Sequence, residues 1–452
     1  MTLGLFDLIG EAMKTKLMRR LALLAALSLL IAACTSDDEG ANSGRVGEAD
    51  SEPVETDDVT SVPLGEVVVA PGEAIQIRSL NSITGDNAAV GLVNQRAVEL
   101  AVAHYGDVNG FDINLGDGLD AQCSAVGGQD AARAIAEDPT VVGVIGTSCS
   151  SSSVTAAPIL GDAGLVMISP SATDPALTAD QLGNPGTASN PGYYRTARND
   201  LFQGQAMAEF LFNDLGQVTA AAIHNDDPTS FGQADLFAAR FEELGGAIVG
   251  FAEITRGESD MVPVLTELAQ GSPGALFLPV SQPEGDLIAI EAAGIAGLES
   301  ATLLSTDTML VDPFLLLEAS EGAFFASPAT GFGDNVNEAT GIAAAEFLAE
   351  YEAVHGEAPT SPSGANAYDA TTLLLDAVRE ASVLDGDTLV IDRTAVRQAL
   401  NNVLAYSGLS GVITCDPLGD CAPQAFDVVR HDTVDDIEAS KRNVVFSFTL
   451  ET

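Results

Sequence analysis

The chain has 452 residues and a formal net charge of -47 at pH 7, from 65 acidic and 18 basic residues. We expect no nucleic acid partner, because binding a polyanion needs clusters of basic side chains that this composition does not supply. An acidic excess of this size mainly sets solubility and self-repulsion.

Residues 1–33 are predicted to be an export signal. Four basic residues between positions 14 and 20 precede an apolar run over 21–33, which is the order found in signal peptides. The run is shorter than the roughly 20 apolar residues that cross a bilayer. Met13 directly precedes the basic segment, so a start at Met13 and a start at Met1 both stay open.

The apolar run ends in Leu30-Ile-Ala-Ala-Cys34. This resembles the lipobox of bacterial lipoproteins, in which the cysteine is acylated after cleavage, so we expect lipid on Cys34 and anchoring at the outer face of the cytoplasmic membrane, in the cell envelope. An ordinary signal peptide with an incidental cysteine is the alternative. Residues 34–71 are mostly polar and acidic, which predicts a disordered tether.

Apolar runs of strand length then alternate with helical patterns. The first group, in chain order, is strand 74–80, helix 95–105, strand 141–146, helix 152–160 and strand 165–169. After Pro191 the pattern restarts with helix 200–215, strand 218–224, helix 232–244, strand 247–254, strand 275–280, helix 284–293 and strand 301–305. This alternation predicts an α/β fold with parallel sheets covered on both faces. Roughly 380 residues are too many for one core, so we expect two such units with a ligand crevice outside the carboxyl ends of their strands.

Two segments carry the strongest functional signal. The first runs Gly143-Val-Ile-Gly146-Thr-Ser-Cys149-Ser-Ser-Ser-Ser153, and the second is Met167-Ile-Ser-Pro-Ser-Ala-Thr-Asp-Pro175. A hydroxyl-rich turn at the start of a helix suits a carboxylate, because helix N-termini offer unsatisfied N–H groups. Helix capping alone explains one serine of the run, not four.

Setting Cys34 aside leaves four cysteines, an even number suited to two disulfides in an oxidising compartment. We predict the pairs Cys123–Cys149 and Cys415–Cys421, the second because its close spacing suits a disulfide that closes a short loop. A zinc site is the alternative, but there is no Cys-x-x-Cys unit and the histidines lie far from the cysteines in sequence. We expect no metal and no cofactor.

The two quoted segments resemble the leucine/isoleucine/valine-binding proteins of the type I periplasmic-binding-protein superfamily, and the resemblance covers residues 72–430. It implies two Rossmann-like, doubly wound lobes joined by a three-strand hinge. Lobe 1 is expected over 72–193 plus 328–404, and lobe 2 over 194–327 plus 405–452. Cys123 also stands where the family places the disulfide partner of the cysteine that opens the serine run.

The resemblance implies a ligand site at matching positions. Ser150 and Thr173 would bind the α-carboxylate of an amino acid, the carbonyl of Ser171 would accept from its ammonium, and Asp307 would pair with that ammonium. A solvated loop acid or a helix cap is the alternative for Asp307.

Two positions depart from the branched-chain pattern. Phe231 stands where the family commonly has tyrosine, and Ser281 stands where branched-chain binders have a tyrosine that contacts the ligand. Because of both changes, the sequence does not determine which side chain the ligand carries. Arg195, Asp200 and the segment around Tyr368 match parts of the family that position the lobes.

The expected function is that of a solute-binding lipoprotein that delivers an amino acid, branched-chain or related, to the permease of an ABC importer. We expect a monomer and no catalysis, because no Gly-x-Ser-x-Gly elbow surrounds the serine run and no base for it is identifiable. The alternatives are a sensor that presents its ligand to an envelope receptor, and a pocket for an amide, urea or an aromatic acid.

Overall fold

The computed structural model describes residues 63–450, apart from 86, 180–182 and 330. The predicted export signal, the lipidation site Cys34 and the tether up to residue 62 lie outside this part of the chain. Within it, none of the helices combines the length and the apolar content that crossing a membrane requires.

Lobe 1 is built on a seven-stranded sheet. Its strands are β2 (Ile75–Asn81), β3 (Asp107–Val108), β4 (Phe111–Asn114), β5 (Leu119–Asp120), β6 (Val141–Gly146), β7 (Val166–Ser169) and β8 (Tyr193–Arg195). Its helices are α2 (Ala88–Tyr105), α3 (Ala125–Ala136), α4 (Ser150–Asp162), η1 (Pro175–Leu177), α10 (Ala344–His355), α11 (Ser363–Glu380) and α12 (Arg393–Asn401). The pairings β2–β6, β6–β7 and β7–β8 are parallel.

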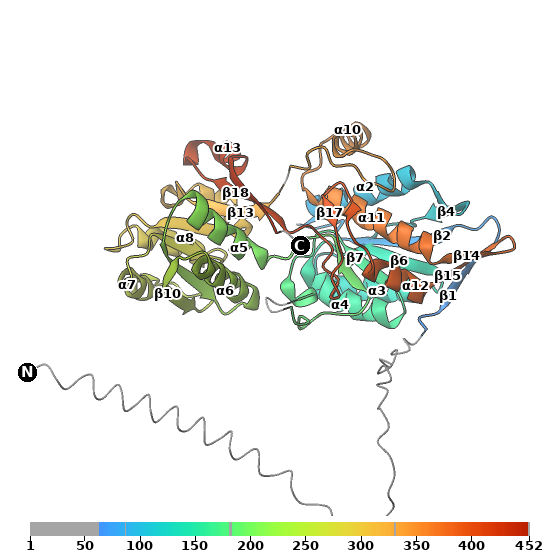
Figure 1. Cartoon of the computed structure of the whole chain (residues 1–452), viewed down its shortest axis with the longest axis horizontal. Coiled ribbons are helices and arrows are strands. Elements are labelled where there is room, and N and C mark those ends of the chain that lie inside the picture. Colours follow the sequence, from blue (N-terminus) through green and yellow to red (C-terminus); the bar gives the residue numbers. More distant parts are fainter. Residues whose placement is uncertain (1–62, 86, 180–182, 330, 451–452) are drawn as a thin grey trace, which may run out of the picture. The chain divides into compact units, whose positions relative to one another are not determined.

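The lobe 1 strands contribute side chains to two cores, and in β6 an irregularity in the pairing with β2 at Val142 interrupts the strict alternation of faces. Val142 and Ile145 of β6 belong to a core shared with α2 and α11. Val141 and Val144 belong to a second core shared with α3 and α4. Figure 1 shows the two pairs of helices on opposite sides of these strands. Both faces of β6 are therefore apolar, and all six of its residues are buried.

Lobe 2 repeats this arrangement on a second seven-stranded sheet, in the order β10-β9-β11-β12-β13-β18-β19. Its strands are β9 (Thr219–Asn225), β10 (Ala247–Ile254), β11 (Ala275–Leu278), β12 (Thr302–Thr306), β13 (Phe324–Pro328), β18 (Ala425–Arg430) and β19 (Val444–Thr449). Its helices are α5 (Phe202–Glu209), η2 (Phe210–Asp214), α6 (Pro228–Glu243), α7 (Val262–Ala269), α8 (Glu284–Ala292), η3 (Asp307–Met309), α9 (Asp312–Leu315), η4 (Glu318–Ser320), η5 (Val434–Asp436) and α13 (Ile437–Lys441). Ala220 and Ala222 of β9 face one core, while Ala221 and Ile223 face the other.

The predicted α/β architecture is confirmed, with one addition. The strands β9 to β13 pair in parallel, but β18 pairs antiparallel with β13, and β19 pairs antiparallel with β18. The chain thus reaches the second sheet again near its end and widens it at one edge.

Three segments connect the lobes, following β8, following β13 and preceding β18. Residues of the loop after α12, including Tyr406 and Leu409, pack in the lobe 1 core with the Cys415–Cys421 disulfide. This loop carries the hairpin of β16 (Tyr406–Ser407) and β17 (Val412–Ile413). We therefore propose a third crossing near residues 422–424, in place of the sequence-based boundary at 404.

The start of the folded region also differs from the sequence expectation, which placed a tether over 34–71. Residues 66–69 form β1 (Glu66–Val69), which pairs antiparallel with β15 (Thr388–Asp392), and β15 in turn pairs with β14 (Ser382–Asp385). Val67 and Val69 alternate with exposed neighbours and are buried in the lobe 1 core. The period-two pattern of these two valines is the one expected for a strand with a single buried face.

Candidate functional site

The serine run forms the first turn of α4, immediately after the loop that follows β6. Cys149 is the N-cap residue and its side chain makes no capping hydrogen bond. The Ser151 hydroxyl donates to the carbonyl of Cys123, at 3.2 Å, and the Ser152 hydroxyl donates to the carbonyl of Ser124, at 3.0 Å. Ser153 shares a 2.9 Å hydrogen bond with the hydroxyl of Thr147. Three of the four serines therefore hold the loop together.

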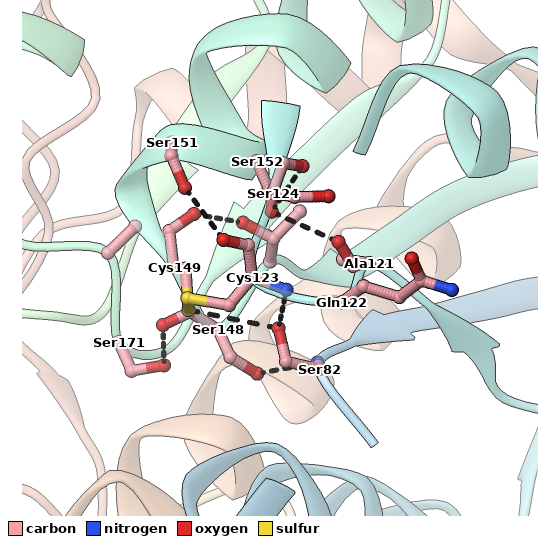
Figure 2. Close-up of a disulfide and its surroundings, with 12 residues drawn as sticks. Ser82, Ala121, Gln122, Cys123, Ser124, Ser148, Cys149, Ser151, Ser152 and Ser171 are labelled. Carbon is pink, nitrogen blue, oxygen red and sulfur yellow. Dashed lines mark hydrogen bonds between the residues drawn. A yellow bond between two sulfur atoms is a disulfide. The ribbon is translucent and has the colours of Figure 1, made fainter. Parts of the chain in front are cut away.

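The disulfide between Cys123 and Cys149 joins the start of α4 to the loop before α3, as predicted. Figure 2 shows it among the hydroxyl groups of Ser82, Ser148, Ser151 and Ser171, which come from different segments of lobe 1. The amide of Cys123 donates to the Ser82 hydroxyl, at 2.8 Å, and the amide of Ser82 donates to the Ser148 hydroxyl, at 3.2 Å. The loops at the carboxyl ends of β2 and β6 are thus tied to each other around the first site segment.

Ser150 differs from the rest of the run in how it is used. Its hydroxyl oxygen accepts from the amide of Asp174, at 3.2 Å, which links the start of α4 to the loop after β7. Among the described residues no acceptor is found for its own hydroxyl proton. Ser150 therefore keeps a donor available at the N-terminus of α4, where the helix dipole favours an anion.

Ser171 and Thr173 lie in the loop after β7, beside the serine run. The Ser171 hydroxyl donates to the carbonyl of Ser148, at 3.1 Å, and accepts from the side-chain amide of Asn94, at 2.9 Å. The Thr173 hydroxyl donates to Asp200, at 2.6 Å. Since the Thr173 proton is committed to this carboxylate, the hydroxyl presents lone pairs, not a proton, on its other side.

The lobe 2 residues of the predicted site follow three neighbouring parallel strands. Phe231 follows β9, Ser281 follows β11 and Asp307 follows β12. Because the carboxyl ends of parallel strands meet at one edge of a sheet, these residues belong to the same edge of lobe 2. In lobe 1 the same rule brings the loops after β6 and β7 together.

Asp307 is held by two donors from the segment that enters lobe 2. Arg198 Nη2 lies 2.9 Å from Oδ2 of Asp307, and Gln203 Nε2 donates to Oδ1, at 2.8 Å. The Asp307 side chain keeps 31% of its accessible surface. It is therefore a partly open carboxylate with an arginine beside it.

A cavity of about 360 Å³ brings several of these groups together between lobe 1 loops, lobe 2 and the crossing segments. Its lining includes the hydroxyl-bearing Ser148, Ser171 and Thr173 and the charged Arg198 and Asp307. Apolar groups complete the lining, among them Val90, Pro170, Phe332, Pro362 and Pro423. The size and the mixture of apolar surface with a few polar groups are typical of a small-molecule site.

The other predicted contacts lie outside the lining of this cavity. Ser150 is connected to the loop that carries Ser171 and Thr173 through its hydrogen bond from the amide of Asp174. Phe231 is 44% exposed and packs edge-on against His224, with ring centroids 5.1 Å apart. Ser281 is exposed in the loop after β11. A larger hollow of about 570 Å³ opens on lobe 2 beside Thr302, at the opposite end of β12 from Asp307.

Arg198 is the charged residue that sequence reasoning missed. It lies between β8 and α5, in the first crossing segment, three residues after Arg195. A signal was present, since a cation at a predicted interlobe crossing is conspicuous in a chain with 65 acidic and 18 basic residues. Its partner Asp307 is 109 residues away, however, and no local pattern indicates that pairing.

The residues expected to position the lobes make enclosed contacts. Arg195 has no exposed side-chain surface and forms a two-pronged ion pair with Asp420, which also accepts from Thr178 and Asn199. Burial raises the pKa of Asp200 to about 6, with the nearby Asp307 carboxylate adding to the rise and Arg198 opposing it. These contacts surround the first crossing segment on both sides of Arg198.

No group of three or more histidine, cysteine or acidic side chains is placed to hold a metal ion in the part of the chain that the structure describes. The four cysteines of the zinc alternative are engaged in the two predicted disulfides, Cys123–Cys149 and Cys415–Cys421. They are therefore unavailable as thiolate ligands.

Comparison with known proteins agrees with this architecture. A family profile described as periplasmic binding protein matches residues 74–430. An amino acid binding protein of Pseudomonas aeruginosa is 28% identical over 44% of this chain, and the chain aligns with about half of that relative, 52% of its length. A Leu/Ile/Val-binding protein homologue of Brucella melitensis is 25% identical over 79% of this chain and 91% of its own.

Solved structures share the fold. A putative branched-chain amino acid ABC transporter protein from Rhodospirillum rubrum is 26% identical, with a TM-score of 0.59 over 80% of this chain and 99% of its own. A branched-chain amino acid transporter substrate-binding protein from Streptococcus pneumoniae, in complex with isoleucine, is 20% identical, with a TM-score of 0.60 over 84% of this chain and 100% of its own. A solute-binding protein from Rhodopseudomonas palustris, in complex with 3,4-dihydroxybenzoic acid, is 19% identical, with a TM-score of 0.56 over 79% of this chain and 93% of its own.

The profile covers most of the chain, and the two doubly wound lobes agree with it. The chain therefore belongs to the periplasmic binding protein family, in the type I group of leucine/isoleucine/valine-binding proteins, whose members bind solutes and are not enzymes.

Proposed function

We propose that this protein is the extracytoplasmic solute-binding component of an ABC importer and that it binds an amino acid, branched-chain or related, between its lobes. The observation that carries the proposal is the cavity in which Ser171 and Thr173 of lobe 1 share a lining with Asp307 of lobe 2. Relatives and structural neighbours named for branched-chain amino acids support this solute class.

The chemistry of the lining fits an α-amino acid. Near the N-terminus of α4, Ser150 can donate its hydroxyl proton to a carboxylate, whereas the hydroxyl protons of Ser171 and Thr173 are committed to Ser148 and Asp200. Asp307 supplies a carboxylate for an ammonium, and such charge-assisted hydrogen bonds are about twice as strong as neutral ones. Valine, proline and phenylalanine side chains of the lining suit an aliphatic group.

Ligand capture would proceed in two stages. The ligand first contacts the loops of lobe 1, and closure about the three crossing segments then brings Asp307, Phe231 and Ser281 toward it. Contacts made only in the closed form would drive the closure, and the permease would recognise that form. Lipid on Cys34 and residues 34–62 would hold the protein at the outer face of the cytoplasmic membrane.

A thermal-shift screen with leucine, isoleucine and valine tests the solute class. A ligand at 100 times its Kd adds about 2.7 kcal/mol of stability, so the melting temperature should rise clearly with at least one of them. Asp307→Asn should weaken binding of that amino acid by about 1.5–3 kcal/mol, the scale of a hydrogen bond to a charged group. If no amino acid raised the melting temperature, the proposed solute class would be rejected.

Aromatic acids are the second candidate. Phe231 is exposed at the lobe 2 edge, and Ser281 is small where the branched-chain pattern has tyrosine, which leaves room for a ring. The R. palustris neighbour was solved with a dihydroxybenzoic acid. Benzoate and dihydroxybenzoate therefore belong in the screen, and a response to them without a response to amino acids would favour this candidate.

A further inference from the structure

Arg198 has more donor capacity than its contacts use. One nitrogen, Nη2, lies 2.9 Å from Asp307 and 3.9 Å from Asp200. Its Nε is enclosed, and among the described residues it has no hydrogen-bond partner. A guanidinium carries five N–H donors in a fixed plane. The enclosed Nε is out of reach of a solute, so a further acceptor would bind at the 15% of the Arg198 side chain that stays exposed, where the residue lines the cavity beside Asp307.

The charges that line the cavity form one adjacent pair. Arg198 and Asp307 are the charged residues of its described lining, and the rest are hydroxyl, amide and apolar groups. A solute with a single charge would pair with one member and leave a net charge beside the other. Because Arg198 and Asp307 keep only 15% and 31% of their side-chain surfaces, water compensates that charge only in part, which makes such binding less favourable.

A zwitterion avoids this cost. An α-amino acid carries its carboxylate and its ammonium on the same carbon, as close together as the two charges of the Arg198–Asp307 pair. Its carboxylate can face Arg198 while its ammonium faces Asp307, so that four charges alternate in a ring. Neither member of the protein pair then loses its partner.

We propose that Arg198 is a ligand-contacting specificity residue and that the Arg198–Asp307 pair selects zwitterionic α-amino acids over solutes carrying only one of the two charges. The proposal rests on the proposed function and deepens it, since it names the charge pattern that the cavity recognises. It also assigns part of the carboxylate recognition to a side-chain cation beside the hydroxyl groups of lobe 1.

The test is isothermal titration calorimetry of the whole protein with three matched probes: L-leucine, 4-methylpentanoate, which lacks the ammonium, and 3-methylbutylamine, which lacks the carboxylate. The wild-type protein should bind leucine about 100-fold more tightly than either analogue. Arg198→Gln should weaken leucine binding by about 10- to 100-fold, the range for a charged hydrogen bond, and leave the amine unchanged or tighter. Asp307→Asn should weaken the binding of leucine and of the amine, and it should weaken the binding of the acid less than that of leucine.

A merely structural role for Arg198 predicts a different pattern. Arg198→Gln would then weaken all three probes by the same factor, or none of them, and either result would overturn the proposal. Arg198→Lys should restore part of the preference for leucine over the amine, because it keeps the charge. Arg442→Gln, at a side chain that is 74% exposed, is the matched control. Absence of any amino acid binding by the wild-type protein would instead reject the proposed function itself.

Discussion

Two arginine–aspartate pairs are formed by arginines three residues apart, Arg195 at the end of β8 and Arg198 on the first crossing segment, and they differ in almost everything else. Arg195 is fully buried and its partner Asp420 is saturated by hydroxyl and amide donors. Arg198 keeps 15% of its side-chain surface, faces a cavity and has an enclosed nitrogen without a described partner. The same two residue types thus serve the fold in one place and offer binding capacity in the other. The structural pair and the ligand-binding pair therefore differ mainly in whether their hydrogen-bonding groups all have partners, and less in how deeply they are buried.

Removing the enclosed arginine should give the largest effect. Arg195→Met leaves the carboxylate of Asp420 buried without its cation, and breaking a buried pair in this way typically costs about 3–5 kcal/mol. Urea denaturation should show this loss in the free energy of unfolding. Arg442→Met, on the surface, should change it by less than about 1 kcal/mol. Equal effects of the two variants would mean that the Arg195 pair is not structural.

Asp200 should give an intermediate effect that depends on pH. Burial raises the pKa of its carboxyl to about 6 in the folded protein, above the value of about 3.9 for an unfolded chain. The folded state therefore holds the proton over a range in which the unfolded state has lost it. The destabilisation from this group accordingly grows as the pH rises from about 4 and is complete above about 6.

Asp200→Asn mimics the protonated carboxyl and removes this dependence. Relative to the wild-type protein, the variant should gain about 1–3 kcal/mol in unfolding free energy between pH 5 and pH 7.5. Denaturation at the two pH values measures the gain. Asp117→Asn, in an exposed loop of lobe 1, is the control and should show no such gain. A pH-independent difference between the wild-type protein and Asp200→Asn would contradict the raised pKa.

Arg198 should give the smallest effect on stability. Its ion pair with Asp307 is partly exposed, and such pairs contribute about 0–1 kcal/mol. Arg198→Gln should therefore unfold within about 1 kcal/mol of the wild-type protein, while its ligand preference changes as described above. A loss as large as that of Arg195→Met would place Arg198 with the structural residues and remove the contrast between the two pairs.

Much of the fold could be predicted from the sequence because its signals are local. The apolar run 141–146 coincides with β6, and both disulfides form between the predicted cysteines. The position of the site at strand ends follows from parallel topology, which placed the loops after β6, β7 and β12 in advance. Ser171, Thr173 and Asp307 consequently meet in the lining of one cavity.

The rest depended on contacts between distant segments. The bonds from Arg198 to Asp307 and from Arg195 to Asp420 span 109 and 225 residues. Neither aspartate partner can be predicted from its distance along the sequence to the arginine. The same holds for the loop that carries Tyr406 and Cys415, which packs in lobe 1 although the chain there is already near its return to lobe 2. Of the serine run, the sequence singled out Ser150 for ligand contact, but the hydrogen bonds by which Ser151, Ser152 and Ser153 hold loops together could not be predicted from it.

The separation between cores and strand-end loops has an evolutionary consequence. Phe231, in the first turn of α6, and Ser281, in the loop after β11, are exposed and lie outside the apolar clusters that stabilise lobe 2. Substitutions there escape the packing penalties that constrain Ala220 or Phe237. Mutations at such exposed positions can accumulate in a lineage without loss of folding, so that a descendant can bind a new nutrient on the same scaffold.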